Sequence, residues 1–374
     1  MNANYIQQLF IKTYRGIQNL SLDELGVVNI LVGDNNSGKT SLLEVLRSIT
    51  HPTSYQTWRR IANRSQGLML PIDTPFESFS WLSNINHPFP EIGYDITLHG
   101  MQHNVLIQGR IENVDFSVSD AKSAGISLIA ETVHDYLNSE DAPLPDAQEM
   151  NLKFFLDGRE QNSVSLFNFA RSPQESDPDR ESLNLFEGPV NYLSPVQHAN
   201  ARPFMSKVFD SPELYESMLE VLQEFEPGII SINADHNDPY SRKLTYKILS
   251  RNNAAALPLK YYGDGINKAL LMMSAVVASK NGILLIDEFE TAIHTTAMPK
   301  TYEWLLSACQ KLNVQLFLTT HSMEAVDKLL EASEIPEELK VIRLKKKHGK
   351  TYARTMSGTE AIQNRKEYDM ELRI

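Results

Sequence analysis

The chain has 374 residues, of which 42% are hydrophobic and 22% charged, and its formal net charge at pH 7 is −12. This composition is typical of a globular protein. The length allows two or three cores, or one large α/β domain that carries an insertion. The apolar runs stay far short of the ~18 residues that a membrane-spanning helix needs. The single cysteine excludes a disulfide framework, and the opening stretch MNANYIQQLF does not resemble a signal peptide. We therefore expect a cytoplasmic protein with no membrane partner.

The acidic balance argues against a protein that coats nucleic acid without regard to sequence, because such binding depends on neutralising phosphates. One segment, Lys340–Lys350, is nevertheless strongly basic. Two interpretations of it stay open. It is a solvated hairpin at the edge of a sheet, kept soluble by its lysines, or it is a local surface for nucleic acid.

Strand and helix patterns alternate at both ends of the chain. The pattern predicts strands at residues 5–14 and 27–32, paired as a hairpin, and then a helix at 39–49. Polar and apolar residues alternate over 92–117, which predicts antiparallel strands. The last third predicts helices at 211–225, 266–280, 297–311 and 323–330, and strands at 283–286 and 314–319. Strands that alternate with helices in this way indicate an α/β fold with a mixed or parallel sheet flanked by helices.

The stretch LVGDNNSGKT at residues 31–40 matches the pattern G-x-x-x-x-G-K-[ST]. Its glycines let backbone N–H groups converge on phosphates, the lysine reaches the β and γ oxygens, and the threonine can bind Mg²⁺. A glycine turn alone arises by chance, but this one has a buried strand before it and a helix after it. We expect ATP to contact the loop residues Gly33, Asn35, Asn36, Ser37, Gly38, Lys39 and Thr40.

A phosphate-binding loop of this kind needs an acidic partner on a neighbouring strand. The run Gly-Ile-Leu-Leu-Ile before Asp287 and Glu288 is the best match. Asp287, with Thr40, would hold Mg²⁺, and Glu288 would polarise the attacking water. The alternative is a strand that merely ends in acidic residues at the surface.

A second glycine turn, which includes Gly263, Asp264, Gly265 and Lys268, opens the helix at 266–280. Its backbone amides could bind another phosphate group. Because the two glycine turns lie at separate helix starts, one chain cannot easily place both on one γ-phosphate, whereas two copies in a head-to-tail dimer can. The alternative is an ordinary turn that caps a helix. His321 follows the strand at 314–319, where it could sense the γ-phosphate, although a lone histidine is more often structural.

These residues resemble the ATP-binding-cassette class of ATPases, and within it the RecF/SMC-related group. The resemblance is greatest to the ATPase part of OLD-family (overcoming lysogenization defect) proteins, and it covers roughly residues 5–50 and 185–360. It implies that Gly33–Thr40 is Walker A, that Gly263–Lys268 is the signature, and that Asp287 and Glu288 belong to Walker B. It also implies that the Arg-Gly-Ile stretch places Arg15 near the nucleotide, and that a D-loop follows Glu288.

Three departures from the family pattern stand out. The signature has Gly263-Asp-Gly where transporter-like members carry Ser-Gly-Gly, and no heptad run predicts a coiled-coil arm. The sequence continues for only about fifty residues after His321, so we expect no Toprim nuclease domain. Gln197 is a weak match for the expected Q-loop glutamine.

The resemblance implies an ATPase whose ATP-driven dimer, or higher oligomer, controls a separate effector of nuclease or toxin type in anti-phage defence. The alternative is a RecF-like DNA clamp in repair, which leaves nucleic acid open as a partner. A metabolic kinase or a transporter subunit fits the glycine turns less well. The cofactors would be ATP and Mg²⁺.

Three parts are expected along the chain. Residues 1–50 form the first part of the ATPase core with Walker A, 51–190 an inserted strand and helix subdomain without an assigned function, and 191–374 the second part of the core.

Overall fold

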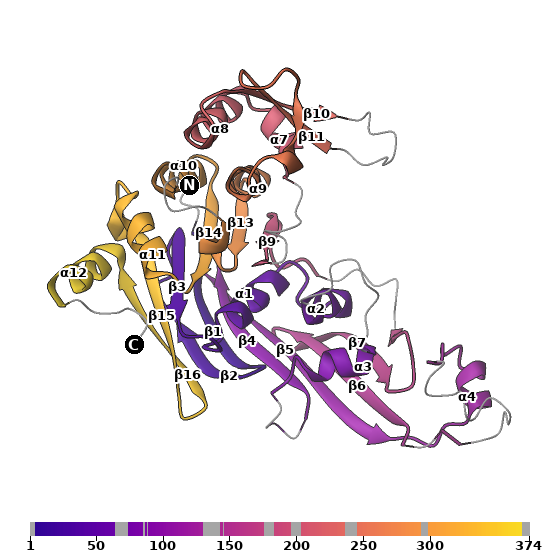
Figure 1. The fold of residues 1–374 in the computed structure, drawn as a ribbon. Helices are drawn as coiled ribbons and strands as arrows, with labels where there is room; N and C mark the ends of the chain where they lie inside the picture. Colours follow the sequence, from indigo (N-terminus) through magenta and orange to yellow (C-terminus); the bar gives the residue numbers. More distant parts are fainter. Residues whose placement is uncertain are drawn as a thin grey trace.

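The computed structural model (Figure 1) describes residues 4–63, 74–84, 87, 89–129, 143–144, 146–175, 183–195, 203–235, 245–292 and 298–368. Three sheets organise these residues: a mixed sheet of six strands, an antiparallel sheet of seven and a small sheet of three. In the described part of the chain, no helix is long and apolar enough to cross a membrane.

The mixed sheet carries the α/β core. Five of its strands run parallel and the edge strand β16 runs antiparallel to its neighbour. In spatial order the strands are β16 (Lys350–Ser357), β15 (Leu339–Lys347), β3 (Val28–Gly33), β14 (Val314–Thr320), β13 (Gly282–Ile286) and β9 (Val190–Leu193). A mixed sheet flanked by helices agrees with the α/β fold that the sequence predicts.

Alternating side chains on these strands divide the interior into two cores. Leu284 and Ile286 of β13 face the core that contains α9 (Asp264–Ala278), α10 (Met298–Lys311) and α11 (Met323–Glu331). Ile283 and Leu285 face the opposite core, which contains α1 (Lys39–Ser48) and the antiparallel sheet. Because successive strand residues point to opposite faces, strands buried on both sides read as continuous apolar runs.

The antiparallel sheet lies below α1 in Figure 1 and covers it. Its strands are β2 (Ile17–Leu22), β1 (Ile6–Tyr14), β4 (Glu91–Leu98), β5 (Met101–Asn113), β6 (Gln148–Leu156), β7 (Arg159–Phe167) and β8 (Gln174–Glu175). The short helices α2 (Tyr55–Ala62) and α3 (Pro75–Ser80) pack into the same core, whereas α4 (Val118–Ser123) belongs to a small separate cluster. The antiparallel strands expected at 92–117 are confirmed.

The hairpin expected between residues 5–14 and 27–32 is wrong. β1 pairs instead with β2, and β3 lies in the mixed sheet between β14 and β15. Asn19 has a positive φ of 49°, which interrupts the regular alternation of β2 and hides that strand in the sequence. The fully buried β3 has no half-exposed face, in keeping with a central parallel strand rather than a hairpin.

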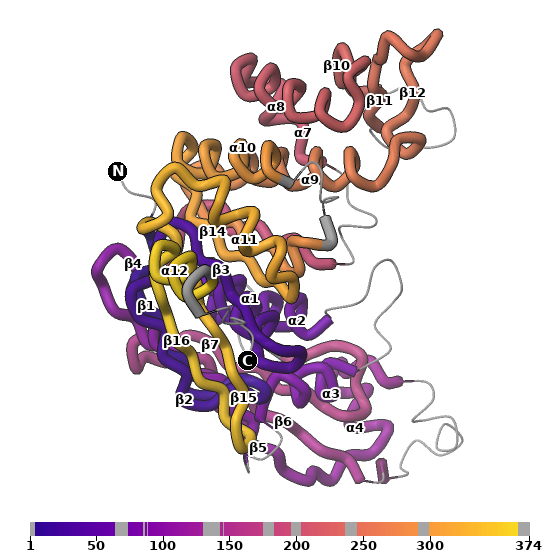
Figure 2. Tube along the Cα trace, turned by 60° about the vertical axis from the view of Figure 1, so that its left-hand side comes forward, coloured from indigo at the N-terminus to yellow at the C-terminus, as the bar shows by residue number. Residues whose placement is uncertain are grey.

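A smaller lobe packs against α9 and α10 and lies at the top of Figures 1 and 2. It contains α7 (Met205–Phe209), α8 (Pro212–Phe225), β10 (Ile229–Asp235), β11 (Thr245–Ser250) and β12 (Leu257–Pro258). The remaining elements are α12 (Gly358–Tyr368) and the short 3₁₀ helices η1 (Leu259–Tyr261), η2 (Phe289–Ala292) and η3 (Pro336–Glu338). The helices expected at 211–225, 266–280, 297–311 and 323–330 correspond to α8, α9, α10 and α11.

The strands between residues 91 and 175 extend the sheet that β1 and β2 begin, and they share a hydrophobic core with α1. The middle of the chain is thus packed against its N-terminal part. The division into 1–50, 51–190 and 191–374 stays a prediction.

One buried amide joins the mixed and antiparallel sheets. Gln315 of β14 is fully buried, and its Oε1 accepts a hydrogen bond from the N–H of Ile6 at 2.8 Å. Its Nε2 donates to the carbonyl oxygens of Ile6 at 2.9 Å and Gly26 at 2.8 Å. The start of β1 is therefore fixed to the central strand of the other sheet.

Replacing Gln315 by alanine should lower the free energy of unfolding by about 3 kcal/mol, because it removes the side chain that bonds the buried N–H and C=O groups of Ile6. Denaturant unfolding followed by circular dichroism measures the change. Gln8→Ala, at an exposed position of β1, is the matched control and should change stability by less than about 0.5 kcal/mol. Equal stability of the two variants would contradict the role given to Gln315.

Candidate functional site

The P-loop begins where β3 ends and leads directly into α1. Gly33 has a φ of 152°, and a Cβ there would lie 2.2 Å from the carbonyl oxygen of Leu344, so no larger residue fits. Gly38 is the N-cap of α1 in the left-handed region, with a φ of 99°. The sequence therefore needs glycine at both positions to turn the chain tightly around a phosphate-sized space.

The side chain of Lys39 folds back over the loop. It is 5% exposed, and its Nζ donates to the carbonyl oxygens of Gly33 at 2.6 Å and Asp34 at 2.9 Å. Burial lowers the pKa of Lys39 to about 8, against the opposing effect of several carboxylates, of which Asp287 is the strongest. The loop thus holds a desolvated cation at its centre.

The carboxylate of Asp287 accepts hydrogen bonds from hydroxyl groups on three elements. Asp287 is 3% exposed and follows β13. It accepts from Thr40 Oγ1 at 2.9 Å, from Thr319 Oγ1 at 2.5 Å and from Tyr192 OH at 3.3 Å. The contact between Thr40 and Asp287 brings together two oxygen donors of the kind that Mg²⁺ prefers.

Thr319 also positions Glu288, through the backbone. The N–H of Glu288 donates to Thr319 Oγ1 at 2.9 Å, and Glu288 has a positive φ of 53°. This conformation is uncommon for a residue with a side chain and is often found at functional sites. Thr319 and Tyr192 were not singled out in the sequence. The only hint of Thr319 was its place in a Thr-Thr-His stretch at the end of a strand.

His321 lies beside the P-loop lysine. Its Nδ1 is 3.4 Å from Lys39 Nζ, and its backbone N–H donates to Glu290 Oε1 at 2.6 Å. The other carboxylate oxygen of Glu290 is buried and has no hydrogen-bond partner among the described residues. The structure therefore brings Lys39, Asp287 and His321 to one edge, at the carboxyl ends of β3, β13 and β14, where α/β sheets bind their ligands.

The remaining residues of the loop differ in exposure, and one of them has a buried polar group that a ligand could bond. Asn35 and Asn36 are exposed, whereas Ser37 is 1% exposed. The hydroxyl of Ser37 has no hydrogen-bond partner among the described residues. A buried hydroxyl without a partner is costly unless a ligand satisfies it, so the loop fits the phosphate chain of ATP.

The structure does not bring Arg15 to the P-loop groups. Its Nε lies 3.1 Å from a carboxylate oxygen of Glu44 in α1 and donates to Tyr14 OH at 3.2 Å. Its Nη1 lies 3.4 Å from the carbonyl oxygen of Trp81. Contact of Arg15 with a nucleotide stays a prediction. Gln197 lies outside the described residues.

The second glycine turn lies in another part of the molecule. Gly263 is the N-cap of α9, and Figures 1 and 2 both show the small sheet and α8 well apart from α1. A Cβ on Gly265 would meet the ring of Phe225 at 3.1 Å, whereas a Cβ on Gly263 would meet nothing within 4 Å. Asp264 is exposed and Lys268 half-buried. Packing within the chain thus accounts for Gly265 but not for Gly263.

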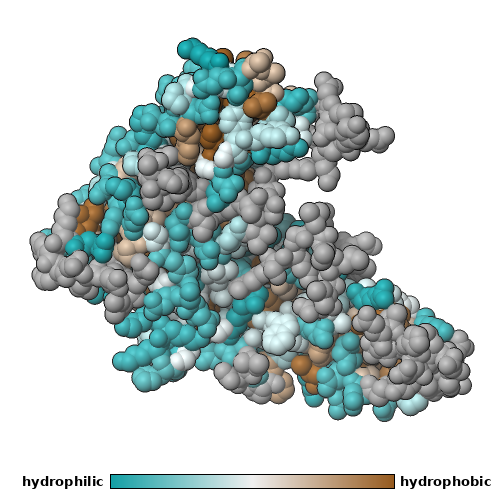
Figure 3. Space-filling view, viewed as in Figure 1, coloured by the Kyte–Doolittle hydropathy of each residue, from teal (hydrophilic) through white to brown (hydrophobic). Residues whose placement is uncertain are grey.

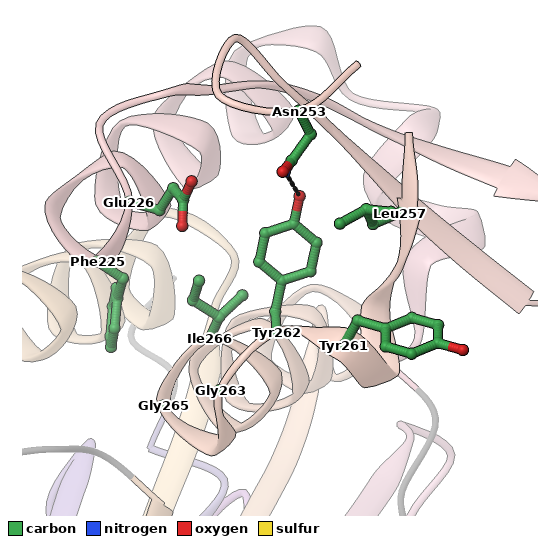
Figure 4. A pocket seen from close by; sticks show the side chains of 9 residues that line it. All are labelled: Phe225, Glu226, Asn253, Leu257, Tyr261, Tyr262, Gly263, Gly265 and Ile266. Carbon is green, nitrogen blue, oxygen red and sulfur yellow. Dashed lines mark hydrogen bonds between the residues drawn. The ribbon is translucent and has the colours of Figure 1, made fainter. Parts of the chain in front are cut away.

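An open hollow of about 410 Å³ adjoins this turn (Figure 4). Its aromatic lining comes from Phe225, Tyr261 and Tyr262, and the hydroxyl of Tyr262 accepts a hydrogen bond from Asn253 at 3.4 Å. Tyr261 is 69% exposed. The start of α9 is therefore accessible from outside the molecule.

The model of the AAA ATPase domain family matches residues 5–326 of the chain. A protein of Helicobacter pylori named ATP/GTP phosphatase is 22% identical over 382 residues, which is 94% of this chain and 96% of that protein. The DNA replication and repair protein RecF of Streptococcus pyogenes is 20% identical over 389 residues, covering 91% of this chain and 97% of that protein.

Among solved structures, the SMC head bound to the C-terminal winged-helix domain of ScpA has a TM-score of 0.51 at 13% identity. The match covers 96% of this chain and 99% of that one. At this identity the likeness shows the fold alone. It is the P-loop ATPase fold of the ATP-binding-cassette type that the sequence predicts.

The lowered pKa of Lys39 predicts that nucleotide affinity depends on pH. As pH rises through about 8, Lys39 in the free protein loses its proton, so ATP binding should weaken by up to about tenfold per pH unit above that value. Bound phosphates favour the charged lysine, so ATP binding above about pH 8 should take up a proton. Isothermal titration near pH 7 and near pH 9, in buffers of different ionisation enthalpy, measures both effects.

The control is Lys39→Arg, whose guanidinium stays protonated throughout this range. If proton uptake above pH 8 persisted in this variant, another group would be responsible.

Proposed function

The chain belongs to the AAA ATPase domain family and is an ATPase, and we propose that ATP binding closes two copies of it into a dimer that controls a separate effector protein. In this proposal ATP and Mg²⁺ are the cofactors, Thr40 and Asp287 bind the metal, and Glu288 activates the attacking water. His321 contacts the γ-phosphate. The protein acts in the cytoplasm.

The main support for this proposal is that the two glycine turns, before α1 and before α9, lie apart in one chain. Lys39, Asp287 and His321 lie together at the carboxyl ends of β3, β13 and β14, whereas the glycine turn at Gly263 is exposed at the start of α9, beside the smaller lobe. Gly263 has a φ of −60° and no described atom close to where a Cβ would be, so nothing in the described part of the chain requires glycine there. Close approach of another molecule's phosphate to this backbone would require it. A second copy of the chain, in two-fold symmetry, supplies such a phosphate.

Control of a partner protein is supported by the charge of the chain and by the solved structure with a similar fold. A net charge of −12 suits a protein partner better than a nucleic acid. The similar SMC head carries a bound domain of another protein, ScpA. The order of the motifs and the Asp-Glu-x-Glu stretch from Asp287 support the finer proposal, an OLD-like ATPase in anti-phage defence whose effector is a nuclease or a toxin.

A RecF-like DNA clamp is the second candidate. The exposed lysines 345, 346, 347 and 350 on the β15–β16 hairpin favour it, as does the similarity to RecF over most of the chain. ATP-dependent, salt-sensitive binding of duplex DNA by the isolated protein would support this function over effector control.

Glu288→Gln should reduce ATP turnover by about 100-fold or more while leaving ATP binding intact, since it removes the proposed base and keeps the shape of the side chain. ATP should then hold this variant as a dimer, which size-exclusion chromatography with light scattering detects. Glu303→Gln, at an exposed position of α10, is the matched control and should behave as the wild type. Normal turnover by Glu288→Gln would identify another residue as the base.

The glycine turn is tested in the same background. Gly263→Asp places a good N-cap residue where there is space, so the monomer should fold and bind ATP normally. Its negative charge should repel the partner's phosphates and abolish the ATP-dependent dimer of Glu288→Gln. A dimer of unchanged stability would exclude this turn from the interface.

Purification from native cells tests effector control. With ATP, the Glu288→Gln variant should retain a partner of nuclease or toxin type that Lys39→Ala does not retain, because the latter loses the phosphate-binding cation. Mass spectrometry of the purified material identifies the partner. A solitary dimer that binds DNA by itself would favour the clamp instead.

A further inference from the structure

Strand order fixes the direction in which a nucleotide must lie across the P-loop. In the mixed sheet β3 has β14 and β13 on one side and β15 and β16 on the other. The groups proposed to act on the γ-phosphate, Glu288 and His321, follow β13 and β14. With these groups at the γ-phosphate, that end of a bound nucleotide would point toward β14, and its α-phosphate and nucleoside would lie on the side of β15 and β16.

The β15–β16 hairpin forms the wall of the P-loop on that side. The pairing of β15 with β3 ends at Leu344 and Gly33, where β3 turns into the loop and β15 continues into the hairpin. A Cβ on Gly38 would lie 3.1 Å from Ile17 and 3.9 Å from Thr351 Oγ1. Thr351, on β16, is 4% exposed. The hairpin thus lies next to the last glycine of the loop.

Side chains along the hairpin point alternately to its two faces, and Lys346 is on the face that is turned toward the P-loop. Leu344 packs into the core that contains α1, so the side chain of Lys346, two residues later, lies on the same face of the strand. Thr351 is the partner of Lys346 in the antiparallel register, which places both on the side of the P-loop. Lys345 and Lys347 lie on the opposite face.

The position of the Lys346 ammonium agrees with this assignment. Its Nζ lies 3.7 Å from where a Cβ on Gly16 would be, above the turn between β1 and β2 and next to Ile17. Lys346 is exposed and makes no hydrogen bond or ion pair with any described residue. Figure 3 shows hydrophilic residues over the lower left of the molecule, where Figure 1 draws the end of this hairpin.

We propose that Lys346 is a second phosphate-binding cation of the ATP site, which contacts the α-phosphate end of the nucleotide from the β15–β16 hairpin. This inference rests on the proposed use of the P-loop for ATP, and it adds a residue that comes from the far end of the chain. Lys39 holds the β and γ oxygens from within the loop, and Lys346 approaches from the wall beside it.

The test compares three single lysine variants by isothermal titration with ATP and with ADP, both in the presence of Mg²⁺. Lys346→Ala should bind both nucleotides about tenfold more weakly, as expected for one charge-assisted hydrogen bond. The factor should be equal for ATP and ADP, because the contact is with the α-phosphate end that both share. Lys345→Ala and Lys347→Ala, on the other face, are the matched controls and should change either affinity by less than about twofold.

The other outcomes separate the alternatives. A loss confined to ATP would place Lys346 on the γ-phosphate and overturn the assignment. Equal losses in all three variants would show a general effect of charge. If none of them changed ADP affinity but all weakened binding of a duplex DNA oligonucleotide equally, the hairpin would be a surface for nucleic acid. Failure of the wild type to bind ATP would instead contradict the proposed function itself.

Discussion

The contact of Asp287 with Thr40 and Thr319 is the interaction on which the arrangement of the site depends. It joins the carboxyl end of β13, the first turn of α1 and the carboxyl end of β14 through one buried carboxylate. The Thr319 hydroxyl also accepts a hydrogen bond from the backbone N–H of Glu288. The same hydroxyl therefore positions the residue that follows Asp287. A carboxylate buried to this degree needs such partners, so the geometry of three separate elements is determined at a single point.

A second buried network lies beneath α1. Tyr14 OH donates to Glu44 at 2.9 Å, and Arg15 pairs with the same carboxylate, which is 2% exposed. Burial, together with the nearby charge of Glu44, raises the pKa of Tyr14 well above its usual range, so its phenol stays a hydrogen-bond donor. The polar contacts fix α1 against β1 in a core that is otherwise apolar. The helix that carries Lys39 and Thr40 is thereby held from above by the mixed sheet and from below by the antiparallel sheet.

Local patterns in the sequence were enough to predict the P-loop, the strand before Asp287 and the helices α1, α8, α9, α10 and α11, whereas α12 and the shorter helices α2, α3, α4 and α7 were not predicted. The loop needs glycine for steric reasons, and strands buried on both faces leave continuous apolar runs, so both appear within a few residues of sequence. The pairing of β1 with β2 could not be predicted in this way, because Asn19 breaks the alternation of β2. The contacts of Thr319 and the role proposed for Lys346 could not be predicted for a different reason. Both depend on strand order and register, which bring together residues that are distant in the chain.

Gln315 and Thr319 lie on the same strand, four positions apart and on the same side of it. The first holds the antiparallel sheet and the second holds the site carboxylate. β14 is fully buried along its length and bonded on both sides, so it has little freedom to stretch or bend. Its amino end is thus fixed to the start of β1 and its carboxyl end to the site carboxylate. A displacement of β14 along its axis would therefore alter the contact with Ile6 of the seven-stranded sheet together with the contact to Asp287.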